Sequence, residues 1–212
     1  MQTGYLMLFQ NGHEGLADVE MVKKEMQLAE LTEECGFDVC WSAEHHFSSY
    51  SMIPDNVQTL TWLAARTTKI KLGTGAVILP WNQPIRVAEK ISMLDTLCDG
   101  RLLFGIGRGL ARREYEAFGV DMEESRERFN EAAPMIFNSL QTGFIEGDGP
   151  FYPQKRTEIR PRPSRSFDGR FYGVAMSPDT IPVVAGLGAS MYFFVQFPIE
   201  AHIPGVEHYR GE

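Results

Sequence analysis

The chain has 212 residues, of which 43% are hydrophobic and 23% charged, and its formal net charge is −8. This length suits one large domain or two small ones, and the composition is ordinary for a globular protein. The negative charge argues against a nucleic-acid-binding surface, which needs clustered Lys and Arg. No run approaches the roughly 18 apolar residues of a membrane span, and no basic-then-apolar signal opens the chain, so we expect a cytoplasmic protein without a membrane segment.

The three cysteines do not indicate a disulfide framework or a zinc site. Cys35, Cys40 and Cys98 are odd in number and lack C-x-x-C spacing. Such thiols are typical of buried or incidental cysteines in a reducing compartment.

Apolar runs and helix-period segments alternate through the first two thirds of the chain. The apolar runs predict strands at 5–9, 37–41, 70–79 and 102–106, and the helical periods predict helices at 18–35, 56–67, 84–98 and 129–140. Gly36 stands where a glycine would end the first helix, and Pro84 suits the first turn of the third.

The rhythm breaks at 142–169, where many glycines and prolines predict an inserted loop with a small hairpin at 144–152. It resumes with a strand at 171–175, a helix at 177–187 capped by Ser177 or the residue before it, and a strand at 191–197. Residues 1–212 are therefore expected to form a single domain.

Strand and helix in repeated alternation predict an α/β fold with a parallel sheet and right-handed crossovers. An open doubly wound sheet and a barrel both satisfy that rhythm. No G-x-G-x-x-G follows the first strand, which disfavours a Rossmann dinucleotide site and favours a TIM (β/α)8-type barrel.

Glu44, His45 and His46 end the second apolar run, where the loops of a parallel sheet converge. Alternate side chains face opposite ways, so His45 should point away from the side shared by Glu44 and His46. One reading is a histidine that fixes the loop. A metal site is weaker, because adjacent histidines cannot easily chelate one ion and no H-E-x-x-H is present. The functional reading is an imidazole that donates or accepts a proton, tuned by the neighbouring carboxylate.

Three further features follow predicted strands. Gly73-Thr74-Gly75-Ala76 would let a planar ligand approach the backbone, or would simply allow a tight bend. Arg108, flanked by glycines, could present its donors to a phosphate or belong to a surface turn.

Ser177-Pro178-Asp179-Thr180 could hold an anion at a helix start, with Asp179 facing out, or only cap that helix. Taken together, an imidazole, small residues, an arginine and an anion site suit a flat ligand with a phosphate tail. Flavin mononucleotide (FMN) or a related deazaflavin has this shape.

As an ordered set, these residues resemble the bacterial luciferase-like monooxygenases, which are flavin-dependent (β/α)8 barrels. The matching segments extend from about Tyr5 to about Phe197. They are 29–30 with 36–38, 41–47, 72–75 with 79–80, 84–89, 94–95, 100–102 with 104–109, and 118–119.

The resemblance implies roles for particular residues. His45 matches the histidine beside the flavin ring and His46 its neighbour, and with Glu44 they are the candidate catalytic residues. Gly75 and Ala76 match the segment under the isoalloxazine ring, where luciferases carry a non-proline cis peptide. The positions around the phosphate match Arg108, Ser177 and Thr180, whereas Met176 stands where the luciferase α subunit has a carboxylate.

The resemblance also implies a reaction. Reduced FMN from a separate flavin reductase, together with O2, would oxidise an aldehyde or another small organic substrate. Other members use the deazaflavin F420 for hydride transfer. No metal, nucleic acid or membrane is expected to take part.

The length departs from the family pattern. A full barrel needs about 250 residues, so six strands predict an incomplete barrel with unpaired edges at the first and sixth strands. One expectation is that another chain, in a homo- or heterodimer, covers these edges. A non-catalytic flavin-binding protein or partner subunit is the alternative function, and a metal-dependent hydrolase on the same barrel is a third.

Overall fold

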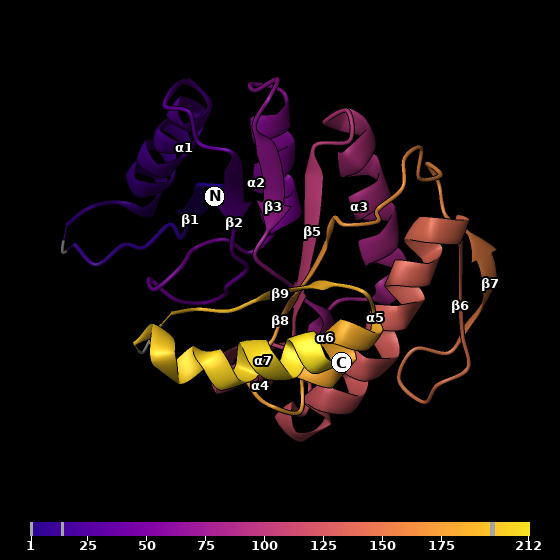
Figure 1. Cartoon of the computed structure of the whole chain (residues 1–212). Coiled ribbons are helices and arrows are strands. Elements are labelled where there is room, and N and C mark those ends of the chain that lie inside the picture. The colour runs from indigo at the N-terminus through magenta and orange to yellow at the C-terminus, as the bar shows by residue number, and fades with distance from the viewer. Residues whose placement is uncertain (1, 14, 196–197) are drawn as a thin grey trace.

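The computed structural model describes residues 2–13, 15–195 and 198–212. Its main sheet is parallel, with strands in the order β1-β2-β3-β5-β8-β9, and β4 pairs with β5 beyond the end of β3 (Figure 1). The strands are β1 (Gly4–Met7), β2 (Val39–Ser42), β3 (Lys71–Thr74), β4 (Val77–Ile78), β5 (Leu102–Gly107), β8 (Phe171–Val174) and β9 (Ser190–Tyr192). The predicted α/β fold with a parallel sheet is confirmed.

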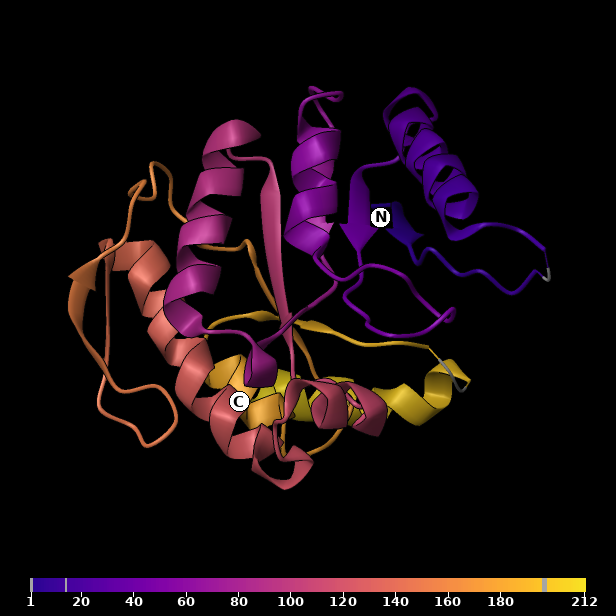
Figure 2. The ribbon, with the colours of Figure 1, turned by 180° about the vertical axis from the view of Figure 1, so that it is seen from behind.

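Helices cover one face of this sheet, as Figure 2 shows from behind. The longer ones are α1 (Asp18–Glu34), α2 (Asn56–Ala64), α3 (Pro84–Leu97) and α5 (Ser125–Thr142). Shorter ones are α4 (Arg112–Phe118), α6 (Ile181–Gly186), α7 (Ile203–Gly211), η1 (Leu79–Trp81), η2 (Met122–Glu124) and η3 (Ile199–His202). Gly36 ends the first helix at a φ of 81°, and Pro84 opens α3, both as expected.

The core lies between the sheet and these helices. Strand side chains such as Leu72 and Phe104 meet helix side chains such as Leu60 and Ile91, and all four are fully buried. Burial of such side chains contributes about 1.5–3 kcal/mol each to folding. The opposite, concave face carries aromatic rings instead, because Trp41, Tyr172 and Tyr192 alternate with the core-facing residues of their strands.

Two strand glycines are needed for close packing on the concave side. A Cβ at Gly73 would lie 2.1 Å from the Trp41 ring, and a Cβ at Gly105 would lie 2.1 Å from the Thr74 carbonyl oxygen. The Thr74 hydroxyl also donates to the Gly105 carbonyl (2.8 Å) and accepts from the Gly105 N–H (2.7 Å). Gly73 therefore makes room for the protein's own tryptophan and not for a ligand.

The single strand predicted at 70–79 is wrong, because the chain divides there into β3 and β4. Between the two strands lies a cis peptide bond joining Gly75 and Ala76.

Residues 142–169 also differ from the expectation. They form an antiparallel hairpin of β6 (Phe144–Gly147) and β7 (Gln154–Glu158), longer than the 144–152 hairpin expected, followed by a Pro-rich return to β8. The sequence pattern did not indicate β7, because this strand is half exposed and carries polar side chains on both faces.

The last part of the chain holds a helix that the sequence pattern did not indicate. Helix α7 packs on α6, and the Tyr209 hydroxyl donates to the Ala189 carbonyl (2.9 Å). Strand β9 ends at Tyr192, earlier than the predicted 191–197 strand, of which residues 196 and 197 lie outside the described residues. Across the described ranges, no helix is long and apolar enough to cross a membrane.

Candidate functional site

Glu44 lies just beyond β2 and anchors the segment that follows β4. Its carboxylate is buried and accepts hydrogen bonds from the Ile78 N–H (3.0 Å), Trp81 Nε1 (2.7 Å) and Asn82 Nδ2 (3.0 Å). His46 Nε2 lies 3.2 Å from the same carboxylate. Four polar groups converge on Glu44, so we interpret it as a residue that positions η1 and His46.

His45 points the other way, as strand alternation predicts. Its ring is one-third exposed, its Nδ1 lies 3.1 Å from Glu114 Oε1, and its ring meets Tyr50 edge-on. The contact with Glu114 occupies Nδ1, so Nε2 is the nitrogen left to exchange a proton with a ligand. The two histidines therefore differ: His46 is buried in the structure, and His45 is accessible.

Glu114 on α4 is the residue that the sequence reasoning missed. Its buried carboxylate accepts from the His46 N–H (2.8 Å) besides meeting His45. Burial alone would raise its pKa, but the bonds from His45 and from the His46 backbone outweigh this and hold the pKa of the Glu114 carboxyl below its usual range. No signal in the sequence indicated this contact, because α4 was not expected and Glu114 lies 69 residues beyond His45.

The cis peptide bond between Gly75 and Ala76 follows β3 and lies beside the segment that carries His45. The Gly75 N–H donates to the Ser42 carbonyl (2.8 Å), which ties the ends of β2 and β3 together. A Cβ at Gly75 would lie 3.3 Å from the Tyr192 hydroxyl, and a Cβ at Gly107 would lie 3.4 Å from that of Ala76. Small residues thus lie along the carboxyl edge of the sheet from the end of β3 to the end of β5.

Arg108 follows β5, and Ser177 and Thr180 follow the neighbouring strand β8. Arg108 Nη1 donates to the Ser125 hydroxyl (2.9 Å), and the Ser177 and Thr180 hydroxyls lie 2.9 Å apart. Arg126 lies 3.6 Å from the outward-facing Asp179, whose side chain is 78% exposed. Positive charge and hydroxyl groups therefore gather where these two strands end.

The predicted helix at 177–187 begins too early. Helix α6 begins at Ile181, with Thr180 at its N-cap position, and Ser177 lies outside it. Pro182 in the first turn fixes this start. With only six residues, α6 has little macrodipole, so the side chains of this turn matter more to an anion than the helix does.

The predicted residues thus form two groups at the carboxyl edge of the sheet. We call Glu44, His45, His46 and Glu114 the imidazole end, and Arg108, Ser177 and Thr180 the anion end. Gly75 and Ala76 lie between them along the strand order. Within the described ranges, no group of three or more His, Cys, Asp or Glu is arranged to hold a metal ion.

Comparison with known proteins shows the family of the chain. The family model of the luciferase-like monooxygenases matches residues 1–212. The chain is a member of this family. The resemblance inferred from the motifs is confirmed.

Individual relatives have similar sequences and the same fold. The alkanal monooxygenase alpha chain of Photorhabdus laumondii is 31% identical over 82% of this chain and 49% of its own. The oxygenase component of a flavin-dependent trigonelline monooxygenase from Acinetobacter baylyi is 29% identical over 76% of this chain and 45% of its own. The crystal structure of the monooxygenase RslO1 from Streptomyces bottropensis superposes with a TM-score of 0.88 at 29% identity, covering all of this chain and 65% of that one. The chain spans about half the length of the curated relatives it matches.

Proposed function

We propose that this chain carries the flavin site of a luciferase-like monooxygenase, which uses reduced FMN and O2 to oxidise an aldehyde or another small organic molecule. One observation carries the proposal. An accessible imidazole, oriented by a buried carboxylate, follows β2, and the cis Gly75–Ala76 bond follows the neighbouring strand β3, at the carboxyl edge of a parallel sheet. Family membership and the relatives' oxygenase activities support it.

The residues fit a flavin phosphate at the anion end. Within the described part of the chain, the Arg108 guanidinium has a side-chain hydrogen bond only through Nη1, so its other N–H groups remain for phosphate oxygens. Ser177 and Thr180 add two hydroxyls, and the outward Asp179 keeps its charge away. Arg108, Ser177 and Thr180 would hold the phosphate, and the Gly75–Ala76 backbone would support the ring.

A bound reduced flavin would supply the electrons and the reaction with O2. The chain's own residues would position and shield it. His45, with Nδ1 held by Glu114, would exchange a proton through Nε2. The rings of Trp41, Tyr172 and Tyr192 would keep water from the concave face.

Cofactor and partners are the finer parts of this proposal. The trigonelline monooxygenase relative is described as an oxygenase component, which supports a separate reductase as the source of reduced flavin. FMN is the first choice, and F420 also carries a phosphate group that the anion end could bind. A dimer would bring a second chain to the open edges of β1 and β9.

A non-catalytic flavin-binding protein is the second candidate. In the described structure, β1 pairs only with β2, and β9 only with β8, so the concave face is not enclosed by further strands. A site open on that side could bind a flavin but would leave the reacting face to water, which favours binding over turnover.

Titration of the purified 212-residue protein with FMN and with F420, followed by absorbance, tests the binding. Conversion of decanal to decanoic acid in the presence of photoreduced FMN and O2 then tests the reaction. We expect His45→Ala to slow decanal oxidation by about 100-fold or more, because proton transfer contributes that much, while FMN affinity changes little. The exposed His13→Ala is the matched control.

The outcomes separate the two candidates. Normal turnover by His45→Ala would refute the role of His45. Tight FMN binding without oxidation of any aldehyde tested would favour the non-catalytic protein. Failure to bind either cofactor would refute both.

A further inference from the structure

A dense basic surface covers the side of the molecule formed by β7 and the chain that follows it. Five of the 20 Lys and Arg residues fall within residues 155–165, together with one acidic residue. This segment therefore carries a charge of +4, whereas the other 201 residues carry −12. We call the surface formed by Lys155, Arg156, Arg160, Arg162 and Arg165 the arginine-rich surface.

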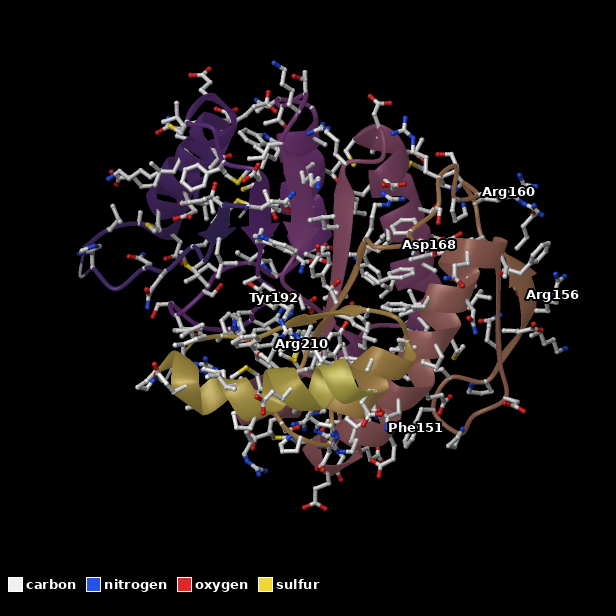
Figure 3. The ribbon with its side chains drawn as sticks, in the orientation of Figure 1. Phe151, Arg156, Arg160, Asp168, Tyr192 and Arg210 are labelled. Atoms are coloured by element: carbon white, nitrogen blue, oxygen red, sulfur yellow. The ribbon has the colours of Figure 1, made fainter. Side chains whose placement is uncertain are left out.

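These cations are exposed and lie on the outside of the fold. All five side chains belong to exposed residues, and Arg160 and Arg162 are 70% and 49% exposed. Strand β7 is the outermost strand in Figure 1, and in Figure 3 Arg156 projects outward from β7 and Arg160 from the segment that follows it. This surface lies outside the hydrophobic core and is not part of the candidate site.

The guanidinium groups are held in place by neighbours. Those of Arg156 and Arg162 lie 3.6 and 4.9 Å from the centre of the Phe144 ring. Glu158 pairs with Arg160 at 2.8 Å and also with Arg162, and these contacts hold the pKa of the Glu158 carboxyl below its usual range. Ordered guanidinium groups lose less conformational entropy when they bind an anionic partner.

Strand β7 also has a free edge. Among the described residues, it pairs only with β6, which lies between β7 and α5. Basic residues on an edge strand often serve to prevent pairing with other chains. Here they would repel a basic strand and attract an acidic one.

Arg165, at one end of the arginine-rich surface, lies at the amino edge of the main sheet, away from the carboxyl edge. Arg165 donates to the Asp99 carbonyl and packs on Gly100, just before β5 begins, whereas Arg108 follows the end of β5. A partner bound here would leave the imidazole and anion ends open.

We propose that this surface binds an extended acidic segment of another protein, which adds as a strand to the free edge of β7. Main-chain hydrogen bonds would give the register, and the cations would select acidic side chains. A second copy of this chain is a poor occupant, because docking its acidic faces here would be heterologous and would not close into a dimer. Nucleic acid is disfavoured, because the remaining surface is negative and Phe144 is already covered by guanidinium groups.

Fluorescence anisotropy with two labelled peptides tests this proposal. One has eight alternating Glu and Val residues, and the other replaces Val with Pro, which keeps the charge but removes N–H groups that a strand needs. We expect the Glu-Val peptide to bind in 50 mM salt, at least about fivefold tighter than the Glu-Pro peptide, and to weaken in 300 mM salt.

A matched pair of double variants locates the binding. Lys155→Gln with Arg156→Gln should weaken Glu-Val binding about tenfold, because two charge contacts are lost. Lys23→Gln with Lys24→Gln on α1 removes the same charge from the other side of the molecule and should have no effect. Equal loss in both, equal binding of the two peptides, or no binding at all would refute the proposal. Tighter binding of an eight-nucleotide single-stranded DNA would also overturn it in favour of nucleic acid.

Discussion

The two ends of the candidate site are built very differently. At the imidazole end, Glu44 and Glu114 are buried and accept several hydrogen bonds each from groups on other elements. At the anion end, Ser177 and Thr180 bond mainly to each other, next to a six-residue helix. The imidazole end therefore depends on the folding of the whole sheet, whereas the anion end depends on one local turn. Substitutions should therefore affect stability at the imidazole end and ligand affinity at the anion end.

The largest effect is expected for Glu44→Ala. It would leave the Ile78 N–H, Trp81 Nε1 and Asn82 Nδ2 without their acceptor in the interior. Since each unsatisfied buried group costs about 1–3 kcal/mol, the free energy of unfolding should fall by about 3 kcal/mol or more. Urea denaturation measures it, with the exposed Glu34→Ala as control. A loss below about 1 kcal/mol would show that Glu44 is not an anchor.

Gly73→Ala should come next. The new Cβ would overlap the Trp41 ring, so the aromatic cluster must shift, at a cost of about 2 kcal/mol. Gly12→Ala, which meets nothing within 4 Å, is the matched control. Thermal unfolding followed by tryptophan fluorescence reports both stability and the position of Trp41. An unchanged spectrum and melting temperature would contradict the close packing.

Glu114→Gln should cost about 2 kcal/mol at pH 7, because hydrogen bonds to a charged carboxylate are lost. The pKa of Glu114 is lowered in the folded protein, so its contribution is present above the ordinary carboxyl range and is lost as pH falls through the folded value. The stability difference between the two proteins should therefore shrink in acid. Denaturation at pH 7, 5 and 3.5 measures this trend. A difference that stays constant with pH would rule out the ionised carboxylate as its source.

Ser177→Ala should have the smallest effect on stability, within about 0.5 kcal/mol, because the hydroxyl bonds only to Thr180 among the described residues. If the anion end holds a phosphate, FMN affinity should fall several-fold while riboflavin affinity stays the same. Isothermal titration with both ligands makes this comparison. Equal losses for FMN and riboflavin would place Ser177 away from the phosphate.

The sequence predicted the scaffold better than the site's internal contacts. The alternation of apolar runs and helical periods identified the strands of the main sheet, except that β3 and β4 were predicted as one, and Gly36 and Pro84 marked helix ends correctly. These signals are local, since they depend on backbone conformation and on which face of an element is buried. The orientation of His45 against Glu44 and His46 also followed from strand alternation.

What the sequence could not give depends on contacts between distant residues. Nothing near His45 indicates that Glu114 is its partner, and three of the four contacts to Glu44 come from a segment more than 30 residues away. The start of α6 was misplaced because Ser177 and Pro178 look like a helix start, while Thr180 and Pro182 provide the actual one. Similar local signals competed, and tertiary packing decided between them.

The strand order has a consequence for how the protein is made. Each strand of the main sheet pairs with the one that precedes it in the path β1-β2-β3-β5-β8-β9, so no strand must wait for a later one. As the chain leaves the ribosome from its N-terminus, each new strand and helix can dock on a surface already in place. The imidazole end would then assemble once α4 has emerged, before Ser177 and Thr180 of the anion end have been synthesised. On a ribosome stalled after α4 has emerged, the Ile78 N–H that donates to Glu44 should already be protected from hydrogen exchange.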